Sequence, residues 1–176
     1  MKITPTQKTA YQFLVHLPIL LIVYVVFSLI GAIKFLGDDP LVGSLPYHQV
    51  AALTNSLLLL ALTSGAIGGG LYALSHERAD ANFPQAGLLR IARLIWTLLS
   101  ALTVIAGLLG LLEGRAGLEL PLLLDVLYVI AAALVLIALV TGVKRWRSLP
   151  LVFTFGLIAL IAGVLVGLIP GDYLND

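Results

Sequence analysis

Long apolar runs alternate with short polar stretches along the whole chain. The apolar runs cover about residues 11–36, 50–74, 88–112, 120–143 and 149–168. Each is about 20 residues or longer, the length that an α-helix needs to cross the hydrocarbon core of a bilayer. Glycine, proline and charged residues fill the breaks between the runs, as in "GDDPLVGSLP" and "HERADANFPQAG". The pattern predicts an all-α integral membrane protein.

Inside a bilayer every backbone polar group must be hydrogen-bonded within the protein, so the apolar runs must be helices. Because the connections are short, sequential helices should be antiparallel neighbours. We therefore expect one transmembrane domain over residues 1–176, a bundle of five transmembrane helices. The first run has no small-residue cleavage site after it, and we interpret it as a retained helix rather than a signal peptide.

Composition supports a membrane protein and excludes several classes of function. The chain is 60% hydrophobic and only 11% charged, whereas soluble domains carry about 25% charged residues. It contains no cysteine, which excludes thiolate-bound iron–sulfur clusters and c-type haem attachment in this chain. Its net charge of +1 suggests no nucleic-acid partner.

The distribution of Lys and Arg predicts the orientation. In the five-helix arrangement, eight of the ten cations lie on the side of the N-terminus: Lys2, Lys8, Arg78, Arg90, Arg93, Lys144, Arg145 and Arg147. Only Lys34 and Arg115 lie on the other side. Loops rich in Lys and Arg stay in the cytoplasm. We therefore expect a cytoplasmic N-terminus and an external C-terminus, in a plasma membrane of bacterial or archaeal type.

Three histidines are candidate haem ligands. His16 and His76 fall near the cytoplasmic face, and His48 falls in the loop before the second span, on the outer face. His48 therefore has no histidine at its own depth, whereas His16 and His76 could meet near the cytoplasmic surface. The alternative for all three is that they lie among hydrated headgroups without a ligand role.

Asp125 is the one acidic residue placed within an expected span. Buried acids in membranes are costly and often functional. Alternatively, Asp125 lies at headgroup depth, where a negative charge stabilises the start of a helix. The spans contain no relay of ionisable groups, which argues against a proton pump or an ion channel.

Small residues four apart predict close helix packing. Gly65 and Gly69 form one such pair, and Gly163 and Gly167 form another in the last span. Pairs of this kind let membrane helices approach closely, either within the chain or against another subunit. Trp96 and the tyrosines Tyr11, Tyr47 and Tyr72 are expected in the aromatic belts at the two membrane surfaces.

The stretch "PYHQVAALTNSLLLLALTSG" with "GGGLYALSHER", and the later "EGRAGLELPLLLDVLYVIAAALVLIALVTGVKRW", resemble the N-terminal helices of the catalytic subunit of cbb-type (C-family) haem-copper cytochrome oxidases, relatives of the nitric oxide reductases. The resemblance covers about residues 11–170. Asp125 falls on an aspartate of that family. However, Thr54 stands where the family has the histidine that binds the low-spin haem, and the chain has five spans where the family's subunit has about twelve.

The resemblance implies a truncated copy that lacks the haem ligand and is located in a respiratory or related electron-transfer complex. We expect a non-catalytic accessory subunit that packs against larger membrane subunits of an oxidoreductase, is surrounded by lipids and carries no cofactor or metal of its own. The alternative is an electron-transfer subunit that binds haem b through His48, or through His16 and His76, with a ligand from a partner. A small transporter is a weaker third hypothesis, because no repeat or broken helix is evident.

Overall fold

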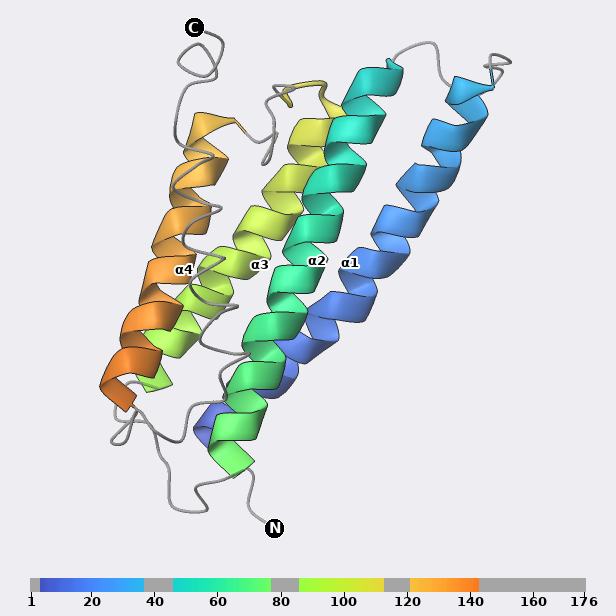
Figure 1. Cartoon of the computed structure of the whole chain (residues 1–176). Helices are drawn as coiled ribbons and strands as arrows, with labels where there is room; N and C mark the ends of the chain where they lie inside the picture. The colour runs from blue at the N-terminus through green and yellow to red at the C-terminus, as the bar shows by residue number, and fades with distance from the viewer. Residues whose placement is uncertain (1–3, 37–45, 77–85, 113–120, 143–176) are drawn as a thin grey trace, which may run out of the picture.

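The described part of the chain is entirely helical. The computed structural model describes residues 4–36, 46–76, 86–112 and 121–142. These ranges contain the helices α1 (Pro5–Phe35), α2 (Tyr47–His76), α3 (Ala86–Leu108) and α4 (Leu122–Gly142) (Figure 1). The first three are long and apolar enough to cross a membrane, and α4 has a shorter apolar stretch, Leu123–Ala138. The all-α membrane class is therefore confirmed, while the expected span 149–168 lies outside the described residues.

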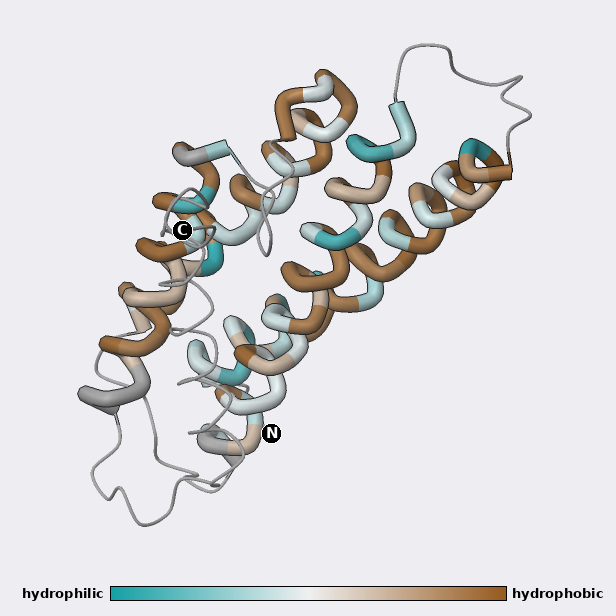
Figure 2. The backbone as a smooth tube through the Cα atoms, turned by 45° about the horizontal axis from the view of Figure 1, so that its top comes forward, coloured by the Kyte–Doolittle hydropathy of each residue, from teal (hydrophilic) through white to brown (hydrophobic). Residues whose placement is uncertain are grey.

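The helices run alternately up and down, in the spatial order α1, α2, α3, α4 (Figure 1). The pairs α1–α2 and α3–α4 make the most extensive contacts, so the bundle consists of two helical hairpins. The first turns of α1 also reach α3. Hydrophobic residues recur along the whole length of each helix (Figure 2), as expected for helices that face both a protein core and lipid.

Helix α1 begins at Pro5 and not near residue 11, where the apolar run begins. Thr4 and Gln7 form a capping box: Thr4 N–H donates to Gln7 Oε1 at 3.0 Å, and Gln7 N–H donates to Thr4 Oγ1 at 3.2 Å. Pro5 stands at the first helical position, where no backbone N–H is needed. The helix thus starts at its polar cap.

Pro18 divides α1 into two halves. Proline cannot donate the helical hydrogen bond, which weakens the helix at that turn. The first half buries Thr6, Thr9, Ala10 and Phe13, whereas only Leu20 and Gly31 are buried in the second half. Exposed apolar side chains dominate after Pro18: Ile19, Ile22, Val25, Val26, Leu29, Ile33 and Phe35. The second half of α1 packs along one side only, against the start of α2.

Helix α2 begins at Tyr47, earlier than the expected residue 50. The carbonyl of Pro46 accepts hydrogen bonds from the N–H groups of Gln49 and Val50, at 3.0 and 3.4 Å. His48 was expected in the loop before the helix, and this placement is wrong. His48 lies in the first turn of α2, because the helix starts directly after the proline.

Helix α3 ends at Leu108 and not at the expected residue 112. Gly110 has φ +71°, and two hydrogen bonds close the helix end, from Leu111 N–H to Ala106 O at 2.9 Å and from Gly110 N–H to Gly107 O at 3.2 Å. This is the Schellman arrangement, in which glycine is favoured because it adopts positive φ without a steric penalty. Gln49 Nε2 donates to Gly110 O at 3.0 Å and connects this helix end to the first turn of α2.

Candidate functional site

A cluster of aromatic and hydroxyl side chains lies where all four helices meet. We call Phe13, Thr63, Ser64, Trp96 and Tyr128 the central cluster; all five are buried. The Trp96 ring lies edge-on to Phe13, with centroids 6.4 Å apart, and tilted against Tyr128, with centroids 5.2 Å apart. Trp96, the largest side chain of α3, therefore contacts residues of α1, α2 and α4.

Hydrogen bonds connect the central cluster across helices. Trp96 Nε1–H donates to Ser64 Oγ at 2.7 Å, and Ser64 donates onward to Leu60 O at 2.8 Å. Thr63 donates to Leu59 O at 2.7 Å, so the 3.3 Å contact with Tyr128 has the tyrosine hydroxyl as donor. Each hydroxyl proton thus has one acceptor, which is what a stable buried network requires. These hydrogen bonds fix the helices relative to one another. All the side chains that form them are uncharged.

Trp96 corrects an expectation. The sequence suggested a membrane-surface position, but its side chain is fully buried between the helices. The interior hydroxyl of Ser64 accepts from its indole N–H, whereas a belt tryptophan would find its acceptor at the headgroups. Tyr11, Tyr47 and Tyr72 are exposed, as residues of the aromatic belts would be.

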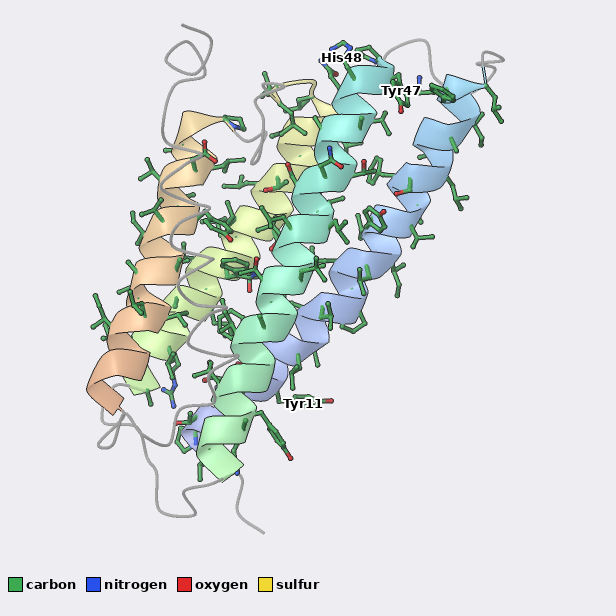
Figure 3. All side chains as sticks on the ribbon, in the orientation of Figure 1. Tyr11, Tyr47 and His48 are labelled. Atoms are coloured by element: carbon green, nitrogen blue, oxygen red, sulfur yellow. The ribbon has the colours of Figure 1, made fainter. Side chains whose placement is uncertain are left out.

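His48 lies beside Tyr47 at the N-terminal end of α2, and Tyr11 lies toward the opposite end of the bundle (Figure 3). The His48 side chain is exposed. The neighbouring Tyr47 packs against Phe35 of α1, with ring centroids 5.6 Å apart. The structure therefore places His48 at one end of the bundle, outside the packed core.

His16 is held between α1 and α3. Its Nδ1 lies 2.8 Å from Gln12 O, and its Nε2 lies 3.1 Å from Thr97 Oγ1. A carbonyl only accepts, so Nδ1 carries the proton. The single Thr97 hydroxyl proton has two acceptors within reach, His16 Nε2 and Arg93 O at 3.0 Å. Iron or another metal at Nε2 would have to displace Thr97 from this position.

The backbones of His16 and His76 lie at different levels of the hairpin formed by α1 and α2. Close contacts at Gly65 with Leu17, and at Gly68 with Leu14, set the register of α1 against α2. His16 therefore lies near the level of Gly65, about 11 residues before His76, or about 16 Å along the helix axis at about 1.5 Å per residue. The backbones of the two histidines therefore lie about three helical turns apart.

Asp125 is buried, with 6% of its surface exposed, and lies in the first turn of α4. Its backbone N–H donates to Pro121 O at 3.2 Å. A carboxylate in the first turn interacts favourably with the helix dipole. This position agrees with the helix-start alternative; a functional role for the buried acid stays a prediction.

The closest approach of α1 to α2 is at Gly68, and only Gly65 of the expected pair Gly65 and Gly69 takes part in this contact. A Cβ added to Gly68 would lie 2.8 Å from the backbone nitrogen of Leu14 and 3.1 Å from Ala10 O, so two helix backbones nearly touch there. At Gly65 a Cβ would meet the Leu17 side chain at 3.1 Å, and at Gly69 it would meet nothing within 4 Å. Gly69 therefore does not belong to the internal contact among the described residues. Gly163 and Gly167 lie outside them.

Thr54, which stands where the oxidase family has its haem ligand, turns back to its own helix. Its hydroxyl donates to Ala51 O at 2.8 Å. This is the usual behaviour of threonine in a membrane helix. Within the described ranges, no group of three or more His, Asp or Glu side chains could hold a metal ion.

A basic pocket lies between the first turns of α1 and α3. It has a volume of about 290 Å³ and is lined by Pro5, Lys8, Thr9, Gln12, Arg90 and Arg93. Along the sequence these cations indicated only the orientation of the chain. Their spacing carried a further signal, because Arg90 and Arg93 lie three residues apart and so share a helix face.

No protein-family model, curated protein or solved structure matches this chain.

Proposed function

We propose that this chain is a non-catalytic accessory subunit that assembles with a larger subunit of a membrane oxidoreductase. The observation that carries the proposal is how the interior polar groups are used. Trp96 bonds to Ser64 and Tyr128 bonds to Thr63 across helices, and the two hydroxyls of α2 donate to carbonyls of their own helix. The two bonds across helices hold the bundle together. A packed bundle of this kind is suited to a scaffold.

The second half of α1 supports assembly with a partner. Within the described ranges, the half of α1 after Pro18 packs against α2, as at Gly31 with Val50 and Phe35 with Tyr47. The side chains of Ile22, Leu29 and Phe35 are each more than half exposed. Lipid can cover such a face, and so can a neighbouring helix. Membrane helices associate through closely fitting surfaces, and the exposed Gly69 offers a second such surface on α2.

The link to an oxidoreductase rests on the resemblance to the N-terminal helices of cbb-type oxidases. Under this proposal residues 149–168 form a fifth transmembrane helix, the N-terminus is cytoplasmic and the C-terminus is external. Reporter fusions at residue 176 test that topology. An external reporter signal supports it, and a cytoplasmic signal excludes either the fifth span or the orientation.

Purification of the tagged full chain in mild detergent tests the function. We expect a larger membrane subunit to co-purify and the pyridine haemochrome spectrum of the complex to show haem held by that subunit. The separated chain should show no Soret band. A Soret band on the separated chain that is lost in His48→Ala would instead support the haem b alternative. A chain that purifies alone from its native membrane would contradict the accessory role.

A further inference from the structure

We propose that the basic pocket between α1 and α3 binds the phosphate group of an anionic lipid. Lys8 comes from the first turn of α1, and Arg90 and Arg93 come from the second turn of α3. Three cations from two helices thus converge on one pocket. The described lining residues contain no acid, since Asp125 is the one acidic residue within the described ranges and lies in the first turn of α4.

The pocket has the chemistry that a phosphate requires. Guanidinium groups donate paired, charge-assisted hydrogen bonds to phosphate oxygens. Arg93 Nε is buried and has no hydrogen-bond partner within the described part of the chain, so its N–H is available to an acceptor that enters the pocket. Thr9 and Gln12 add polar side chains to the wall.

Both helices begin at this end of the bundle (Figure 1). The N-terminal end of a helix carries a partial positive charge, so the two helix dipoles add to the field of the three cations. The backbone of Arg93 is itself fixed, because its carbonyl accepts from Thr97, which contacts His16 of α1. The two walls of the pocket are therefore connected just behind it.

The depth of the pocket favours a lipid over a soluble ligand. Tyr11, an exposed residue suited to the headgroup region, lies one turn along α1 from Lys8. Lys8 thus comes just before the apolar run, at the level where lipid phosphates lie. Basic pockets between transmembrane helices on the cytoplasmic side bind anionic headgroups in this way.

Titration of the purified full chain with dioleoyl phosphatidic acid tests the proposal. The bound lipid is counted by native mass spectrometry and the melting temperature is followed in parallel. Dioleoyl phosphatidylcholine and inorganic phosphate serve as the comparison ligands. We expect phosphatidic acid to bind at least tenfold more tightly than phosphatidylcholine, at about 1.4 kcal/mol per factor of ten, and added salt to weaken the binding.

The variant Lys8→Gln/Arg90→Gln removes two exposed cations and should lower the affinity for phosphatidic acid by about tenfold or more. Arg93→Lys keeps the charge but loses the paired donors, and should cost less. Lys34→Gln removes one positive charge at the other end of α1 and should leave the affinity unchanged. Because Lys8 and Arg90 are exposed, the double variant should fold, as its circular dichroism would show.

Three results would overturn the proposal. The double variant could bind phosphatidic acid as tightly as the unmodified chain, or phosphatidylcholine could bind as well as phosphatidic acid. Stabilisation by inorganic phosphate equal to that by the lipid would assign the pocket to free phosphate instead.

Discussion

Two interfaces of this bundle differ in how closely the helices approach. Between α1 and α2, Gly68 brings two backbones nearly into contact at Leu14 and Ala10. Between the two hairpins, the space is filled by the Trp96 ring, and hydrogen bonds cross it to Ser64 and from Tyr128 to Thr63. Burial from water does not drive helix association in lipid. One interface therefore depends on backbone contact, and the other on large side chains with satisfied polar groups.

The glycine interface should be the more sensitive to added volume. Gly68→Leu would place a side chain where even a Cβ lies 2.8 Å from a backbone nitrogen, and a backbone cannot move aside as a side chain can. We expect a loss of about 3 kcal/mol, at the upper end of overpacking costs. The measurement is the melting temperature of the purified chain in detergent.

Gly69→Leu is the matched control, because a Cβ at Gly69 meets nothing within 4 Å. It should melt like the unmodified chain. If it also prevents co-purification of a larger subunit, then Gly69 faces that subunit. Equal melting of the two leucine variants would mean that α1 does not approach α2 at Gly68.

The hairpin interface should respond to loss of its largest side chain. Trp96→Phe keeps an aromatic ring but removes the indole N–H that bonds to Ser64. Ser64 keeps its bond to Leu60, so the cost is about 1 kcal/mol for the hydrogen bond and about 1 kcal/mol for the lost volume. Chemical unfolding in mixed micelles measures this difference.

Trp146→Phe, at the chain's other tryptophan, is the control and leaves Trp96 as the sole tryptophan, whose fluorescence can be excited selectively. Brominated lipids should then quench the fluorescence only weakly, because Trp96 is buried inside the bundle. Strong quenching would contradict this burial and would mean that Trp96 lies at the membrane surface.

A substitution at the C-terminal end of α3 tests the edge of the interface between the two hairpins. Gly110 has φ +71°, and its carbonyl accepts from Gln49 of α2. Gly110→Ala introduces a side chain into the left-handed region, at a cost of about 1 kcal/mol. Gly87→Ala, where a Cβ meets nothing within 4 Å, should leave the melting temperature the same or slightly higher. A stable Gly110→Ala variant would contradict this helix end.

The hydrophobic pattern predicted the four described helices but not their ends, because the pattern follows the apolar run while the ends follow local hydrogen bonds. The capping box at Thr4 and Gln7, the carbonyl of Pro46 and the turn at Gly110 place the ends elsewhere. The first and last of these have sequence signatures, a Thr-x-x-Gln spacing and a glycine near the end of an apolar run.

The packing faces were less predictable, because both lipid and protein interior select apolar residues. The stretch "SGAIGGG" contains three small pairs four apart, Ser64 with Gly68, Gly65 with Gly69 and Ala66 with Gly70. Sequence alone does not choose between them, and the structure places Gly68 in the internal contact. For the same reason the pattern around Trp96 did not show that it points inward. The basic pocket depends on the approach of α1 to α3, which no local pattern contains.

The smallest expected effect is at the tyrosine of the hairpin interface. Tyr128→Phe removes the hydroxyl that donates to Thr63 across 3.3 Å, the longest hydrogen bond of the central cluster. Hydrogen bonds between membrane helices average about 0.6 kcal/mol, so the variant should lose about that much. A double-mutant cycle with Thr63→Val, read out by chemical unfolding, isolates the pair, because Thr63 also donates to its own helix at Leu59. A coupling near zero would mean that the contacts of Trp96 with Ser64 and Phe13, rather than the Tyr128 hydrogen bond, hold the two hairpins together at this point.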